Sequence, residues 1–491
     1  MSQRVEIKRL PSGVPGLDNV LGGGLPEFSF NLIAGGAGGG KTTLAHQIMF
    51  ANATPERPAL FITILGEPPI KMLRYQQQYS FFDADKVPDS VRFLHLGAEV
   101  LDGGLEKMLA SIVEEVEATR PFFVFVDSFR SVARRSEGQM ELQSFVQRLS
   151  LQLTSWEATT FLIGEYEEPE AAGNPIFTIA DGIVWLSQVT SRNSVVRKLQ
   201  VAKMRGQGQI PGLHTMKISD AGVRVYPRLP NPDEHPPGRS DHRELRKTGV
   251  VGLDEMLAGG IPSGYSVMVL GPSGSGKTML STQFIREGIT NGEPGVIAVF
   301  EKRPEEYLTT APNREELTEL VAKGMLKMLY LRPLDLSVDE TMEEIAAAVR
   351  AIGAKRIAID SLSGFELALA PSFREDFRES LYRMVGALVG LDVTVMMTSE
   401  LVESYTELRF SPHGISFLTD AIILQRYAEI DGELRKLLLV AKMRGVGHSK
   451  QLRLYDIGED GIVMGDALTG YEGILSGSPW LRTAVDAEDA S

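Results

Sequence analysis

The sequence GGAGGGKT, from Gly35 to Thr42, recurs 236 residues later as GPSGSGKT, from Gly271 to Thr278. Both stretches fit the pattern G-x-x-x-x-G-K-[ST], in which backbone N–H groups of a glycine-rich loop turn inward around phosphate oxygens. The residues after each loop have helical spacing, and a helix N-terminus adds favourable dipole charge for an anion. Each stretch therefore predicts a strand, a phosphate-binding loop and a helix, in that order.

The two loops belong to a longer internal repeat. GVPGLDNVLGGGLP at 13–26 matches GVVGLDEMLAGGIP at 249–262, and the hexamer VAKMRG occurs at 201–206 and again at 440–445. All the matches keep the same order, with offsets between 233 and 239 residues. We therefore predict two copies of one domain.

The predicted domains are residues 1–230 and 247–480, with a proline-rich linker at 231–246 and a short acidic tail at 481–491. Within each copy, short β-rich runs alternate with helical patterns. In the second copy these patterns predict strands at 266–270, 296–300 and 356–359 and a helix at 340–352. Such alternation predicts an α/β fold in each copy, with a mostly parallel sheet flanked by helices.

Composition limits the chemistry that the chain can carry. It has 491 residues, no cysteine, and 64 acidic against 50 basic residues, for a net charge of −14. The lack of cysteine excludes disulfides, thiolate metal sites and cysteine nucleophiles. The acidic balance disfavours a protein that coats nucleic acid or an anionic membrane. Because the sequence shows neither a membrane-spanning run nor a secretory signal, we expect a soluble, cytoplasmic protein.

The loop residues are the predicted nucleotide-binding set, with Lys41 and Lys277 directed at the β- and γ-phosphates. The set comprises Gly35, Gly36, Ala37, Gly38, Gly39, Gly40, Lys41, Thr42 and Thr43 in the first copy, and Gly271, Pro272, Ser273, Gly274, Ser275, Gly276, Lys277, Thr278 and Met279 in the second.

Each copy also has an aspartate that closes an apolar strand: Asp127 ends PFFVFVD and Asp360 ends KRIAID. Such a residue can cap a helix or form a turn. Because each aspartate lies downstream of a phosphate-binding loop, we assign both aspartates to Mg²⁺ binding, together with the hydroxyls of Thr42 and Thr278.

A catalytic carboxylate is predicted at the end of the strand that follows the loop and its helix, 60–64 in the first copy and 296–300 in the second, because it would polarise water or accept a proton from a hydroxyl. In the second copy this residue is Glu301, but Leu65 takes the corresponding place in the first copy. Glu67 lies two residues further on and would serve as the base only if the backbone bulges. The alternative is that Glu67 is a solvated turn residue before two prolines.

The repeated VAKMRG hexamer contains a lysine and, two residues later, an arginine: Lys203 and Arg205 in the first copy, and Lys442 and Arg444 in the second. On a strand, residues two apart point to the same face. Two neighbouring cations repel unless an anion lies between them, and a γ-phosphate would satisfy both. The alternative is a solvated basic edge that protects a sheet from aggregation.

With these motifs in place, the chain resembles the KaiC family, the double-domain RecA-like ATPases of circadian clocks. The resemblance covers nearly the whole chain, from the two entry motifs to GYEGILSGSP at 470–479. It implies two RecA-like domains, hexamers of stacked rings with ATP and Mg²⁺ between subunits, and clock or signalling proteins as partners. It also implies that Lys203, Arg205, Lys442 and Arg444 act in trans on a neighbour's nucleotide.

The resemblance further implies an autokinase in the second ring, which transfers phosphate to an adjacent Ser-Thr pair and can reverse the transfer. Here Ser416 matches the serine, and Phe417 replaces the threonine. Ser416 is thus the expected phosphoacceptor, with a packing role as the alternative. The family has two consecutive glutamates after the second strand, where this chain has Glu301-Lys302 and Leu65-Gly66.

Three functions follow as hypotheses. The leading one is a hexameric ATPase and serine autokinase with its chemistry in the second ring. The second is a nucleotide-gated signalling scaffold with little turnover, which the missing carboxylate of the first copy favours. The third is a DNA recombinase or helicase, which the −14 charge and the lack of basic runs with interleaved aromatics disfavour.

Overall fold

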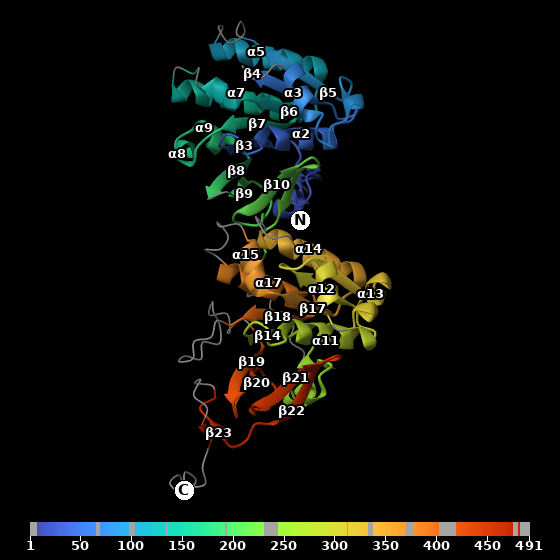
Figure 1. Ribbon diagram of the computed structural model, residues 1–491. Coiled ribbons are helices and arrows are strands. Elements are labelled where there is room, and N and C mark those ends of the chain that lie inside the picture. The colour runs from blue at the N-terminus through green and yellow to red at the C-terminus, as the bar shows by residue number, and fades with distance from the viewer. Residues whose placement is uncertain are drawn as a thin grey trace, which may run out of the picture. The chain divides into compact units, whose positions relative to one another are not determined.

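A computed structural model describes residues 7–64, 69–97, 104–133, 136, 138–191, 194–229, 244–311, 313–331, 337–369, 377–401, 419–474 and 480–481. It divides into two units, Met1–Arg228 and Leu229–Ser491. Each unit contains a nine-stranded, mostly parallel sheet flanked by helices (Figure 1). The predicted α/β class and the duplication are therefore confirmed.

In the first unit the strands lie in the order β5 (Val91–Leu96), β4 (Ala59–Ile64), β6 (Phe123–Asp127), β7 (Thr159–Glu165), β3 (Phe30–Gly35), β8 (Gly182–Ser191), β9 (Ser194–Met204), β10 (His214–Ser219) and β11 (Gly222–Tyr226). The six strands from β5 to β8 in this order, which include β4 and β3, are parallel to one another. Strands β9, β10 and β11 continue the sheet in antiparallel pairs. A separate ribbon pairs β1 (Arg9–Leu10) with β2 (Leu25–Pro26). The helices are α1 (Leu17–Val20), α2 (Lys41–Asn52), α3 (Pro69–Gln76), α5 (Gly104–Thr119), α6 (Phe129–Ala133), α7 (Gln139–Ser155), α8 (Glu168–Ala171) and α9 (Pro175–Ile179), with a 3-10 turn at Ala84–Lys86.

The second unit repeats this order as β16 (Leu326–Tyr330), β15 (Gly295–Val299), β17 (Arg356–Asp360), β18 (Thr394–Glu400), β14 (Ser266–Gly271), β19 (Ala421–Ile430), β20 (Glu433–Met443), β21 (Arg453–Gly458) and β22 (Gly461–Ala467). Two ribbons pair β12 (Leu245–Arg246) with β13 (Ile261–Pro262), and β23 (Tyr471–Glu472) with β24 (Trp480–Leu481). The helices are α10 (Val251–Met256), α11 (Lys277–Thr290), α12 (Pro304–Thr310), α13 (Arg314–Ala322), α14 (Val338–Ile352), α15 (Leu362–Ala368) and α17 (Phe377–Gly390).

The core lies on both faces of each sheet, because residues of a strand alternate between faces. On β6, Phe123 and Phe125 pack in one cluster with residues of α2, while Val124 and Val126 pack in another with residues of α5 and α7. Such a strand is buried on both sides and reads as a continuous apolar run, as FVFV does. The second unit has the same arrangement, with α11 on one face and α14 and α17 on the other.

The predicted elements of the second unit match the observed ones to within two residues. The helix expected at 340–352 begins at Val338, because the hydroxyl of Ser337 caps it by accepting a hydrogen bond from the amide of Glu340. Within the described part of the chain, no helix is both long and apolar enough to cross a membrane.

Candidate nucleotide-binding sites

The two predicted phosphate loops have the same backbone shape. Each follows the central parallel strand of its sheet, β3 or β14, and leads directly into a helix, α2 or α11. The φ angles are +71° and +92° at Gly38 and Gly40, and +78° and +94° at Gly274 and Gly276. Glycine is favoured at these positions, since residues with a side chain rarely adopt a positive φ angle. A Cβ on Gly40 would also lie 2.5 Å from a methyl group of Ile218.

The loop lysines are held by the loops themselves. The ammonium group of Lys41 donates to the carbonyl of Gly36 at 2.7 Å, and that of Lys277 donates to Gly271 and Pro272 at 2.8 and 2.7 Å. Burial lowers the pKa of both lysines, although neighbouring carboxylates act in the opposite direction. Each loop thus holds a partly desolvated cation next to the amides that would surround phosphate oxygens.

The predicted Mg²⁺ ligands come together in both units. The hydroxyl of Thr42 donates to Asp127 at 2.8 Å, and that of Thr278 donates to Asp360 at 2.7 Å. Burial raises the pKa of Asp127, against the hydrogen bond from Thr42 and the charge of Lys41. Hydroxyl and carboxylate oxygens suit Mg²⁺, which takes few protein ligands and completes its shell with phosphate and water. Among the described residues, no group of three or more acidic or histidine side chains is placed to hold a metal ion.

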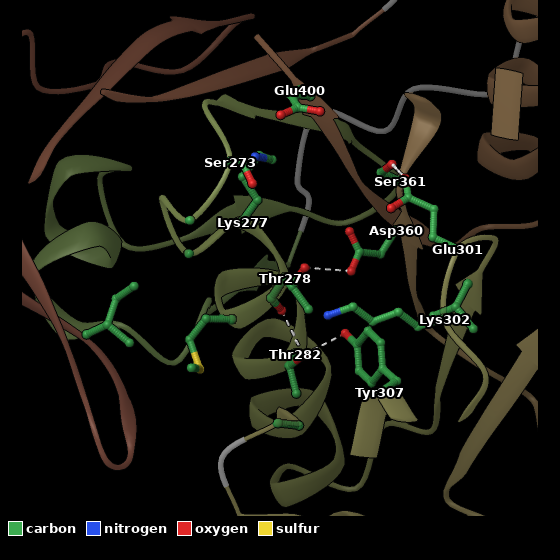
Figure 2. A pocket seen from close by; sticks show the side chains of 16 residues that line it. Ser273, Lys277, Thr278, Thr282, Glu301, Lys302, Tyr307, Asp360, Ser361 and Glu400 are labelled. Carbon is green, nitrogen blue, oxygen red and sulfur yellow. Dashed lines mark hydrogen bonds between the residues drawn. The ribbon is translucent and has the colours of Figure 1, made fainter. Parts of the chain in front are cut away.

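In the second unit these groups line a pocket of about 400 Å³ (Figure 2). Of the predicted loop residues, its lining includes Ser273, Gly274, Gly276, Lys277, Thr278 and Met279. The side chain of Ser275 points elsewhere, because its hydroxyl donates to the buried Gln425 at 3.1 Å. The pocket therefore combines the loop, the Thr–Asp pair and the ends of β15 and β18.

The predicted catalytic carboxylate, Glu301, lies in this pocket. Its Oε1 accepts a hydrogen bond from the hydroxyl of Ser361 at 2.9 Å, and that hydroxyl in turn accepts from the amide of Gly364 at 3.0 Å. Ser361 is the N-cap of α15. The start of a helix thus holds the carboxylate in place, one residue after Asp360.

Sequence reasoning missed several residues of the site. Glu165 and Glu400 end β7 and β18, opposite Gly35 and Gly271 in the parallel register, and both act electrostatically on the loop lysines. Their signal was available, since the repeat aligns LIGE with MTSE. Thr398 was also missed; it donates a second hydrogen bond to Asp360.

Tyr307 and Thr282 complete the wall of the pocket below the loop. Their hydroxyl groups are 2.7 Å apart, and Tyr307 is buried, which raises the pKa of its phenol. No sequence motif indicates this pair, because a tyrosine in the first turn of a helix is typical of an ordinary core residue.

The VAKMRG cations lie at the other end of the central strand from the loop. Lys203 and Lys442 are on β9 and β20 as predicted, and each arginine follows one residue after the strand ends. Lys203 pairs with Ile183 near the start of β8, next to the start of β3. The loop follows the opposite end of β3.

The arginine of each pair faces an aspartate of its own unit, while the lysine donates to backbone carbonyls. Arg205 forms an ion pair with Asp181 at 3.0 Å, and Arg444 approaches Asp420 at 3.8 Å. Burial and the adjacent arginine lower the pKa of Lys203, and Lys442 has the same arrangement. Sequence reasoning missed both aspartates, although each precedes a strand at matching places of the repeat.

Five further positions lie outside the described residues: Leu65, Gly66 and Glu67 after β4, and Ser416 with its neighbour Phe417 before β19. The carboxylate expected in the first unit and the expected phosphoacceptor therefore stay predictions.

Comparison with known proteins agrees with this geometry. The family model described as "ATPase: KaiC" matches the chain twice, at residues 10–230 and 246–468. The circadian clock oscillator protein KaiC of Rippkaea orientalis is 29% identical over 98% of this chain and 93% of its own length. KaiC 1 of Synechocystis is 28% identical over 98% and 94%, and KaiC of Synechococcus elongatus 27% over 99% and 94%. With two matched repeats, two phosphate loops and two Thr–Asp pairs, the chain belongs to the KaiC ATPase family.

Proposed function

We propose that this protein binds ATP with Mg²⁺ at both loops and hydrolyses it chiefly in the C-terminal unit. The observation that carries the proposal is the presence of Glu301, Lys277 and Asp360 in one pocket. The relatives are named circadian clock oscillator proteins, and a role in timing or signalling through protein partners is part of the proposal.

The residues of the C-terminal pocket divide the work between them. The loop amides and Lys277 bind the phosphates, and Thr278 with Asp360 would hold Mg²⁺, which neutralises charge on the β- and γ-phosphates. Glu301, fixed by Ser361, accepts a proton from water or from a hydroxyl group that attacks the γ-phosphate. Burial lowers the pKa of Lys277, and the charges of Glu400 and Asp360 oppose this shift.

The test is phosphate release by the full chain and by two matched variants, Lys277→Ala and Lys41→Ala. We expect Lys277→Ala to lose at least about tenfold in rate, because a positioned cation stabilises the transferring phosphoryl group. The loss in Lys41→Ala should be smaller. Equal release by wild type and Lys277→Ala would refute the assignment.

We further propose serine autokinase activity, and its reversal, with Ser416 as the acceptor. A single serine allows one phosphorylated state, whereas a two-site cycle would require a second hydroxyl at position 417. Labelled ATP tests this directly. Transfer of label to wild type and its loss in Ser416→Ala would support the proposal; equal labelling of both would exclude it.

Assembly as an ATP-dependent homohexamer is also proposed, and the position of the VAKMRG cations supports it. Lys203 and Arg205 lie at the end of the sheet remote from the loop of their own unit. A phosphate that they contact would therefore not be the one bound by the loop of their own unit, which agrees with the proposed action in trans. Light scattering with and without ATP tests the assembly, and Arg444→Ala mixed with Lys277→Ala tests action in trans.

The second candidate is a nucleotide-gated scaffold with little turnover. Leu65 in place of a carboxylate favours it for the N-terminal unit, where ATP would act as a ligand that holds the assembly together. This candidate predicts ATP-dependent hexamers with negligible phosphate release.

A further inference from the structure

Lys302 extends into the C-terminal pocket. It follows Glu301 directly, and both residues line the pocket, but their side chains take different directions. Glu301 turns toward Ser361. In Figure 2, Lys302 reaches across the pocket with its ammonium group toward Thr278 and Tyr307. A cation therefore lies at the end of the pocket where the Thr278–Asp360 pair is placed to hold a metal.

The charges around the pocket leave this cation available to a ligand. Lys277 is bound to two loop carbonyls, and its pKa responds to Glu400, Asp360 and Glu301. Throughout the described residues, by contrast, Lys302 makes no hydrogen bond or ion pair with the protein, and it is exposed. An ammonium group that makes no contact with the described residues and is directed into the proposed phosphate-binding pocket is suited to a phosphate oxygen.

We propose that Lys302 is a second phosphate-binding cation, which lets the C-terminal unit bind ATP without a divalent metal ion. This inference rests on the proposed ATP binding. A lysine bound to phosphate oxygens neutralises charge that Mg²⁺ would otherwise neutralise, and a positive charge near Thr278 and Asp360 repels a divalent cation. Metal-free ATP and Mg·ATP then bind the C-terminal unit with similar affinity.

The N-terminal unit supplies the internal comparison. Its sequence has Gly66 at the position that corresponds to Lys302, so it brings no second lysine at this place. It keeps the loop lysine and the Thr42–Asp127 pair. ATP binding by the N-terminal unit should therefore depend strongly on Mg²⁺, within the same chain and under the same conditions.

Hydrogen exchange of the full chain, measured by mass spectrometry, reports ATP binding at each loop separately. Peptides that cover residues 35–42 and 271–278 are followed during titration with ATP, once with excess Mg²⁺ and once with EDTA. For wild type we expect protection of both loops with Mg²⁺, and protection of only the C-terminal loop with EDTA. Lys302→Gln should weaken ATP binding at the C-terminal loop by about tenfold or more in EDTA and much less with Mg²⁺.

Two variants serve as controls. Lys302→Arg keeps the charge and should keep metal-free binding, and Lys450→Gln removes an exposed lysine of the same unit that is not part of the pocket. If the C-terminal loop of wild type is protected only with Mg²⁺, or if Lys302→Gln loses affinity equally in both conditions, the inference is wrong. If neither loop is protected by ATP and Mg²⁺, the proposed function fails instead.

Discussion

The two units differ in the layer where the helix that follows the phosphate loop packs on the sheet. In the N-terminal unit this layer is aromatic: His46 of α2 stacks on Phe61 with ring centroids 4.4 Å apart, and Phe125 stacks on Phe161 at 5.0 Å. In the C-terminal unit the position of His46 is taken by Thr282, whose hydroxyl bonds to Tyr307 and faces the pocket.

The strand residues change together with the helix residue. The register pairs Phe61 with Phe125 and Phe125 with Phe161, while the matching residues of the second unit are aliphatic: Ile297, Ala358 and Met396. One fold thus tolerates a stacked aromatic layer or an aliphatic one, provided that the volume is filled. The phosphate loop and the Thr–Asp pair are the same in both units, so these parts of the site do not depend on whether the layer is aromatic or aliphatic.

The largest expected difference between the units is catalytic. Glu301→Gln should lower the rate of ATP hydrolysis by about 10²–10⁴-fold, because the amide cannot accept a proton. The rate is measured by phosphate release, with Glu305→Gln, an exposed glutamate of α12, as the control. If Glu301→Gln leaves the rate unchanged, hydrolysis does not depend on Glu301, and the N-terminal unit becomes the expected site of hydrolysis.

The next effect concerns Arg356 at the start of β17, where the first unit has Phe123. The guanidinium donates to Glu293 at 2.7 Å and to the carbonyl of Phe284 at 2.9 Å, and it lies over the Phe284 ring. Arg356→Met should destabilise the C-terminal unit by about 1.5–3 kcal/mol, because Glu293 keeps its ion pair with Arg246 but loses the one with Arg356, and the carbonyl of Phe284 loses a charged donor.

Urea unfolding followed by hydrogen exchange, which assigns each transition to a unit, measures this loss. The matched change Phe123→Met in the N-terminal unit replaces one apolar side chain with another and should cost less than about 1.5 kcal/mol. Similar costs for both changes would show that the buried arginine acts only as packing volume.

The third effect is the pH dependence that His46 gives to the N-terminal unit. Burial lowers the pKa of His46 from 6.5 to about 3. Between these values the unfolded chain binds a proton that the folded unit does not bind, so the unfolding free energy falls as the pH falls below 6.5. The slope is at most about 1.4 kcal/mol per pH unit for this group.

His46→Phe keeps a ring on Phe61 and removes the titration. The unfolding free energy of the N-terminal unit, measured from pH 7 to pH 5, should therefore fall less steeply in the variant than in wild type. Parallel curves would mean that His46 titrates normally.

The smallest effect concerns the hydroxyl pair of the C-terminal unit. Tyr307→Phe removes the phenol that contacts Thr282 at 2.7 Å and should cost about 0.5–1.5 kcal/mol of stability. Thermal unfolding checks the value, with Tyr330→Phe, a half-buried tyrosine on β16, as the control. A cost that matches the control would mean that the hydroxyl pair adds nothing to the layer.

Most of the fold was readable from the sequence because the repeat supplied two independent copies of each signal. The strand ending in Asp127 and the one ending in Asp360 confirm each other, as do the two loops. The network that supports the site was less readable. Thr398 and Ser361 act through contacts between separate strands and helices, and a single polar residue at a strand end carries no motif.

The direction of the Thr278–Asp360 hydrogen bond has one more consequence. The threonine donates its only proton to the carboxylate, so the lone pairs of its oxygen must point away from Asp360. A metal ion that binds this hydroxyl finds the oxygen already oriented and loses little free energy to rotation of the side chain. Thr42 and Asp127 repeat the geometry, and both units are therefore preorganised for an ion before any nucleotide arrives.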